Sequence, residues 1–191
     1  MHIEYTAEQT ALQPKLAPAN INPDSFLATD YLNHYNEVVM LLEMIPDMPD
    51  MVEDAADWQP KSYAQHFIDS GFQGPKLAIE AFDLAPDPIK ISFNHVCGEI
   101  DKLVLSTVAG LLSLNVVERG LSAAAQELIR QRVTSAKELL LKLTQVVNGH
   151  IEDSESFVAA VDLLNSSLPE NEQDHDLGEV QTQDDIDKLF D

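Results

Sequence analysis

Apolar residues recur every three or four positions along much of the chain, and this spacing is typical of helices that bury one face. One such stripe occupies residues 30–45, where Asp30 is placed to cap a helix and Pro46 ends it. The turn-rich stretch 50–86, with the aromatic-rich segment 58–82 inside it, predicts short helices that cap a bundle. Methionine fills irregular gaps in a core, so we interpret three residues near the break as core packing: Met44, Met48 and Met51.

The strongest helical pattern lies in residues 87–149. Pro86 and Pro88 fit the start of a first helix, where a missing N–H is harmless. Gly120 ends that helix and Ser122 caps a second one, so we expect an antiparallel hairpin joined by a tight turn. The predicted buried stripes are Phe93, Cys97, Ile100, Val104, Val108 and Leu111 in the first helix, and Ala125, Ile129, Val133, Ala136, Leu140, Leu143 and Val147 in the second.

The sequence therefore predicts an all-α fold with a helical bundle domain over residues 25–149. A lone hairpin has too little core, so either helix 30–45 packs on it or two copies pair as a homodimeric four-helix bundle. Prolines in residues 1–24 predict an irregular, disordered arm. Residues 150–180 are expected to form an acidic flexible linker, and residues 181–191 a short amphipathic docking helix.

Charge narrows the choice of partners. The 191 residues include 33 acidic and 11 basic side chains, for a formal net charge of −22. Such a surface repels nucleic-acid phosphates and anionic membranes, and it suits a partner with a basic patch. The sequence shows neither a signal-peptide pattern nor about 18 consecutive apolar residues, so the expected compartment is the cytoplasm.

The end of the chain carries an amphipathic pattern. Thr182 and Asp185 are spaced like a capping box at a helix start. Ile186, Leu189 and Phe190 follow at i, i+3 and i+4, which places them on one helical face. A helix this short is unstable alone, so we expect it to fold in the groove of a partner. The alternative is that it docks on its own bundle.

The string TQDDIDKLF resembles the CheY-binding peptide of bacterial chemotaxis, which begins the flagellar switch protein FliM and ends the phosphatase CheZ. In that pattern Thr182 replaces a serine and Asp185 replaces a glutamate, while four other positions match directly. The resemblance implies that the tail binds a CheY-type response regulator. The implied partner-binding residues are Gln183, Asp184, Asp185, Ile186, Asp187, Leu189 and Phe190.

The overall plan is also similar to CheZ, with a long hairpin, an acidic linker and a terminal docking helix. In that family a carboxylate and an amide, one helical turn apart, enter the receiver's active site and position a water for hydrolysis of the aspartyl phosphate. The nearest pair here is Glu127 and Gln131 in QELIRQ, opposite the apolar stripe. The family's Asp-x-x-x-Gln and Thr-Gly-Gln patterns are absent, so an ordinary solvated helix face is the alternative. The chain itself needs no cofactor, because Mg²⁺ belongs to the receiver.

Two further hypotheses remain open. The first is a non-catalytic adaptor that the tail attaches to a receiver. The second is a histidine phosphotransfer protein acting through His95 in FNHVCGE, although the His-x-x-Lys-Gly setting of such proteins is absent. Cys97 is expected to be a small core residue. No metal site is expected. The acid-rich run 47–57 lacks a calcium-loop glycine, and four histidines show no paired ligand spacing: His34, His66, His95 and His150. His175 has neighbouring carboxylates, but the predicted linker offers it no rigid frame.

Overall fold

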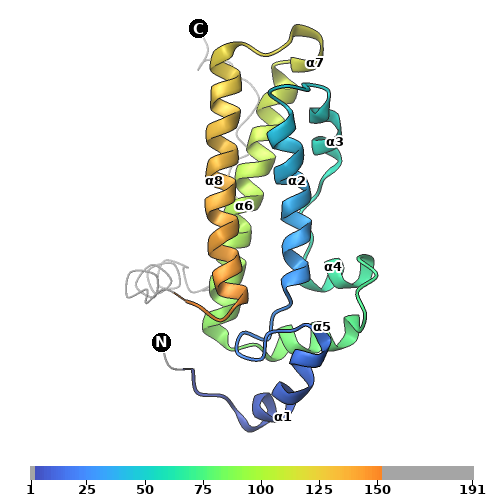
Figure 1. Ribbon diagram of the computed structural model, residues 1–191, viewed down its shortest axis with the longest axis vertical. Helices are drawn as coiled ribbons and strands as arrows, with labels where there is room; N and C mark the ends of the chain where they lie inside the picture. The colour runs from blue at the N-terminus through green and yellow to red at the C-terminus, as the bar shows by residue number, and fades with distance from the viewer. Residues whose placement is uncertain (1–2, 152–191) are drawn as a thin grey trace, which may run out of the picture. The chain divides into compact units, whose positions relative to one another are not determined.

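The computed structural model describes residues 3–151, and every regular element in this part of the chain is a helix (Figure 1). The predicted all-α class is therefore confirmed there. Within the same residues, no helix combines the length and the apolar character that crossing a membrane requires. The helices are α1 (Ala7–Leu16), α2 (Leu32–Met44), α3 (Met51–Asp57), α4 (Tyr63–Asp69), α5 (Pro75–Leu84), α6 (Asp87–Ser113), α7 (Val116–Arg119) and α8 (Ala123–Val147), with 3₁₀ turns at Ala17–Ala19 and Thr29–Tyr31.

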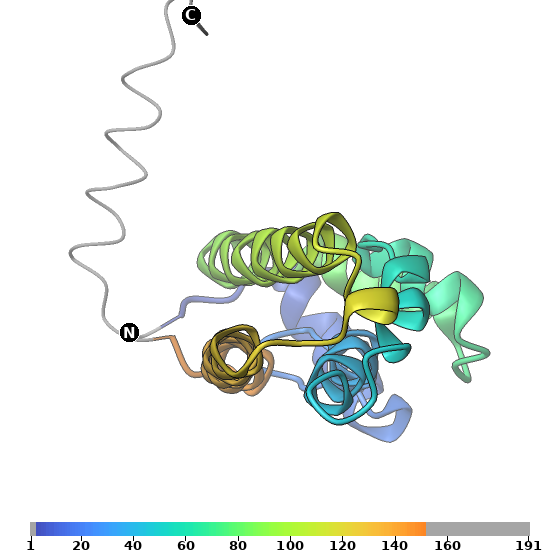
Figure 2. The ribbon, with the colours of Figure 1, turned by 90° about the horizontal axis from the view of Figure 1, so that it is seen from above.

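Three long helices run alongside one another, with α8 packed against both α6 and α2 (Figures 1 and 2). The short helix α3 packs against α2 and α6, and it lies beside these two helices when the bundle is seen from above (Figure 2). The core forms where the apolar stripes meet. All six predicted stripe residues of α6 are buried, and in α8 only Ala125 and Leu140 are partly exposed. Burial of these faces supplies the main stabilising free energy.

The connection between α6 and α8 differs from the expected tight turn. The chain leaves α6 through Asn115, whose φ of +52° is left-handed, and then forms the short helix α7. Val116 is buried, and burying this side chain holds α7 against the end of the bundle. Gly120 ends α7 rather than α6, with φ +71°. The Ser122 side chain caps α8 as predicted, accepting a hydrogen bond from the Ala125 N–H at 3.2 Å.

The predicted irregular arm over residues 1–24 is wrong for residues 7–16, which form α1. Thr6 and Gln9 make a reciprocal capping box at its start. Leu12 and Leu16, one turn apart, are both buried. Gln9 also donates from Nε2 to the Leu84 carbonyl at 2.8 Å, which ties α1 to α5. The cap and the buried face outweigh the cost of Pro14 inside the helix.

Two expectations at the ends of α2 are also corrected. Asp30 does not cap α2, because its carboxylate lies 3.1 Å from Nε2 of His66 in α4. The methionine prediction is wrong for Met44 and Met48, which are exposed, the latter by 42%. Met51 is partly buried and packs against the core, as predicted. Ile45 and Pro46 take the buried positions where the chain turns, so Met44 and Met48 point outward.

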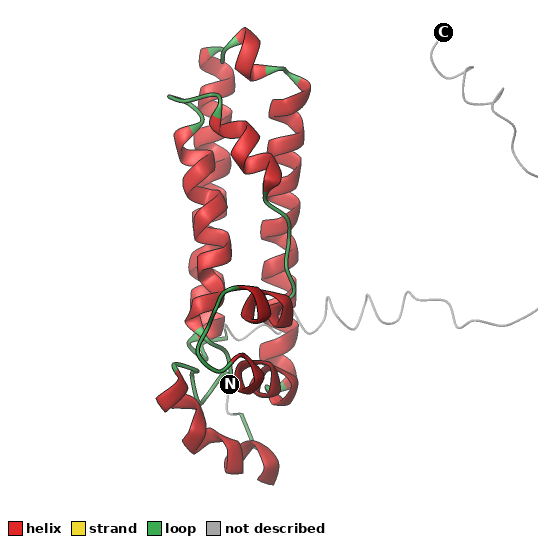
Figure 3. Ribbon diagram, turned by 90° about the vertical axis from the view of Figure 1, so that its right-hand side faces the viewer, coloured by secondary structure: helices red, strands yellow, loops and turns green. Residues whose placement is uncertain are grey.

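Residues 50–86 form the three short helices α3, α4 and α5, as predicted. The strand-like link between α3 and α4 runs along the bundle (Figure 3). Trp58, at its start, donates from Nε1 to the carbonyl of His34 at 3.0 Å. The Tyr63 hydroxyl accepts a hydrogen bond from the Ala28 N–H at 2.8 Å, and its ring stacks on Phe82. The aromatic side chains therefore join α4 and α5 to the bundle.

Candidate functional site

Glu127 and Gln131 lie on the solvent face of α8, one helical turn apart. Both side chains are exposed, because Ile129, Val133 and the following stripe residues turn the opposite face of α8 into the core. The Gln131 amide donates from Nε2 to Oε1 of Glu127 at 3.2 Å. The pair thus presents a carboxylate and an oriented amide to solvent. The amide oxygen of Gln131 remains available to accept a hydrogen bond from water.

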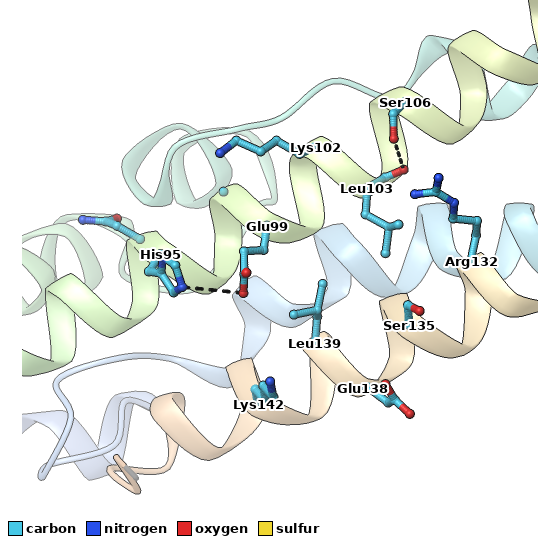
Figure 4. A pocket seen from close by; sticks show the side chains of 12 residues that line it. His95, Glu99, Lys102, Leu103, Ser106, Arg132, Ser135, Glu138, Leu139 and Lys142 are labelled. Carbon is cyan, nitrogen blue, oxygen red and sulfur yellow. Dashed lines mark hydrogen bonds and ion pairs between the residues drawn. The ribbon is translucent and has the colours of Figure 1, made fainter. Parts of the chain in front are cut away.

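A groove of about 690 Å³ lies between α6 and α8 (Figure 4). Its α8 wall includes Arg132, the residue after Gln131, and Ser135, one turn beyond it. Leu103 from α6 and Leu139 from α8 point toward each other across its floor. The groove is therefore an open channel with an apolar floor and polar walls.

Three cations line this groove: Lys102 on α6, and Arg132 and Lys142 on α8. Within residues 3–151, none of their side chains forms a hydrogen bond or an ion pair. By contrast, Lys137, on another side of α8, pairs with the Glu43 carboxylate. The groove holds three cations against two carboxylates, Glu99 and Glu138, so its local net charge of +1 is opposite in sign to the −22 of the whole chain.

His95, the phosphotransfer candidate, also lines the groove. Its side chain is 51% exposed, and its Nε2 lies 3.7 Å from the carboxylate of Glu99, one turn along α6. Glu138 adds a second carboxylate from the α8 side. The exposure of His95 meets one requirement of a phosphotransfer histidine. Its position off the stripe of Phe93 and Cys97 is consistent with that exposure.

Cys97 is buried in the core, as expected from its place in the stripe. Burial raises the pKa of its thiol to about 12, so the thiol stays protonated and unreactive near neutral pH. Asp101, one turn further, accepts a hydrogen bond from the Tyr35 hydroxyl at 2.9 Å and links α6 to α2. Burial raises the pKa of this carboxyl, against the effect of the Tyr35 bond. Both groups serve the core rather than a surface site.

Two histidines that are far apart in the sequence come together in an aromatic cluster. The ring of His34 stacks on Trp58 with centroids 4.9 Å apart, and its centroid lies 6.2 Å from that of His66. His34 is buried, and its Nε2 has no hydrogen-bond partner in the described part of the chain. Burial, with smaller effects from His66 and Lys61, lowers the pKa of His34 to about 4. The ring is therefore neutral at pH 7.

These groups do not assemble a metal site. Among residues 3–151, no group of three or more His, Cys, Asp or Glu side chains is placed to hold a metal ion. The acid-rich run 47–57 contains α3, with Glu53 and Asp54 in its first turn, where the helix dipole favours negative charge. His175 lies outside the described residues.

The sequence predicted the exposed positions of Glu127 and Gln131 but not the basic groove. Its cations come from two helices that are some 30 residues apart in the chain, although each lies on the polar side of its own stripe. The structure describes only residues 150 and 151 of the predicted linker. The docking helix and the seven tail residues fall outside the described residues: Gln183, Asp184, Asp185, Ile186, Asp187, Leu189 and Phe190.

No protein-family model matches the chain, and neither a characterised protein nor a solved structure does.

Proposed function

We propose that this protein is a cytoplasmic regulator of chemotaxis or motility that captures a phosphorylated CheY-type receiver and promotes its dephosphorylation. The tail string TQDDIDKLF supports the choice of partner. The observation that carries the catalytic part is the exposed Glu127–Gln131 pair, one turn apart on a long helix. The resemblance to CheZ in the order of hairpin, acidic stretch and terminal motif supports the same assignment.

The proposed chemistry asks the protein only to position groups. Hydrolysis of an aspartyl phosphate needs a water in line with the bond between phosphorus and the leaving carboxylate, and such reactions depend on positioning and electrostatics. The Gln131 amide orients that water, and the Glu127 carboxylate pairs with a lysine of the receiver. The 3.2 Å bond between the two side chains limits the rotation of the amide before the receiver arrives. The receiver supplies the Mg²⁺.

Binding is tested first. A purified CheY-type receiver, with and without beryllofluoride, is titrated against the full chain and against a chain ending at Val180. We expect tight binding only when both beryllofluoride and residues 181–191 are present. Equal affinity for the two chains would show that the tail similarity is accidental.

Turnover is tested with Gln131→Ala in the full chain, measuring phosphate release from the phosphorylated receiver. Loss of a water-positioning group is expected to slow release by about 100-fold while receiver affinity stays unchanged. The matched control is Gln145→Ala, which removes another exposed glutamine of α8, about 21 Å further along the helix. Normal release by Gln131→Ala with intact binding would instead favour the adaptor function.

Phosphotransfer is the second candidate, supported by the exposed side chain of His95. It predicts acid-labile phosphate on this chain after incubation with a phosphorylated receiver, and no such phosphate on His95→Gln. The proposed phosphatase leaves the chain unphosphorylated, so one labelling experiment separates the two functions.

A further inference from the structure

The groove between α6 and α8 is continuous with the proposed site. Ser135 and Lys142 follow Gln131 at i+4 and i+11 and share its side of α8. The distance along the helix from Gln131 to Lys142 is about 16 Å. A protein partner of ordinary size covers about 800 Å² on each side, or roughly 28 Å across. A partner seated over Gln131 therefore reaches into most of the groove.

The charge of the groove fits a phosphorylated partner. A phosphoryl group adds about two negative charges at neutral pH. The chain as a whole carries −22 and repels such a partner at long range. Lys102, Arg132 and Lys142 offset that repulsion, because their side chains form no ion pair within residues 3–151. Glu99 and Glu138 also line the groove, so its three cations exceed its carboxylates by one charge.

We infer that the α6–α8 groove is a second receiver-binding surface, whose cations attract the phosphorylated face of the receiver toward Glu127 and Gln131. This inference rests on the proposed function and deepens it. The tail supplies one attachment to the receiver, and the groove supplies the orientation that directs the phosphoryl group to Gln131. Arg132, exposed and next to Gln131 in the chain, carries the nearest of these charges along α8.

The test reverses charge inside and outside the groove. Arg132→Glu and Lys142→Glu are compared with Arg130→Glu in the full chain. Arg130 is exposed on the same helix, but it lies about 200° around the axis from Arg132. All three variants change the net charge equally, and their exposed positions leave the core intact. Urea denaturation checks that each variant keeps the wild-type stability.

Affinity for the beryllofluoride-activated receiver is measured at low and at high salt. We expect each groove variant to bind about tenfold more weakly at low salt and to lose much of the salt dependence, since charges at an interface act mainly through steering. Arg130→Glu is expected to bind within about twofold of wild type. Equal weakening by Arg130→Glu would mean that only net charge matters, and it would overturn the inference.

The outcomes separate this inference from the proposed function. Groove variants that bind like wild type, in a protein whose tail still captures the receiver, refute the groove and leave the proposed function standing. A wild-type chain that binds no receiver refutes both.

Discussion

The buried imidazole of His34 is expected to make the stability of the protein depend on pH. Its imidazole is 7% exposed, its Nε2 lacks a hydrogen-bond partner within residues 3–151, and Trp58 stacks on it. Protonation would place a charge in this apolar surrounding, close to His66 and Lys61. These effects lower the pKa of His34 from 6.5 to about 4.

The lowered pKa of His34 determines how the free energy of unfolding changes with pH. Because the folded pKa lies below the unfolded value, the unfolded chain binds more protons between those two values, and stability falls as the pH falls. The full shift corresponds to about 3 kcal/mol. Between pH 7 and pH 5, the loss of unfolding free energy from His34 alone is about 2 kcal/mol.

The perturbation is His34→Phe, which keeps an aromatic ring against Trp58 and removes the titrating group. Urea unfolding is followed at pH 7, 6 and 5, above the sequence pI of 4.3. Between pH 7 and pH 5, wild type is expected to lose about 2 kcal/mol more than the variant. The raised pKa of Asp101 acts in the opposite direction, but it is common to both proteins and cancels in the difference.

His150→Gln serves as the control, because it removes an exposed histidine and should leave the pH dependence of wild type intact. Parallel stability curves for wild type and His34→Phe would refute the reasoning. So would a wild type that gains stability relative to the variant on acidification, because that requires a raised pKa for His34.

Two further predictions concern the bundle itself. Ile100→Ala removes a fully buried side chain from the middle of α6 and should cost about 2–5 kcal/mol of unfolding free energy in urea, whereas Ile91→Ala, on the exposed face of the same helix, should cost less than about 1 kcal/mol. Thr6→Ala removes the capping box of α1 and should cost about 1 kcal/mol, while Thr6→Ser should retain most of it; equal losses from the two variants would contradict the capping role.

The sequence by itself determined the long helices and which of their faces is buried. Spacing of three and four residues is a local property, so the stripes that contain Ile100 and Val133 could be placed without knowing what covers them. The exposure of Glu127 and Gln131 followed from the same periodicity, because they lie opposite the α8 stripe. The cap at Ser122 is also a local signal.

Only the tertiary structure decided the features that depend on two segments meeting. The formation of α1 depends on its contact with α5. The positions of prolines in the sequence do not reveal that contact. His34 is buried because Trp58, 24 residues away, covers it, and the basic groove exists because α6 and α8 bring Lys102 and Arg132 to the same channel. Solvation and charge act through space, so neither the lowered pKa of His34 nor the local reversal of charge can be read from spacing along one helix.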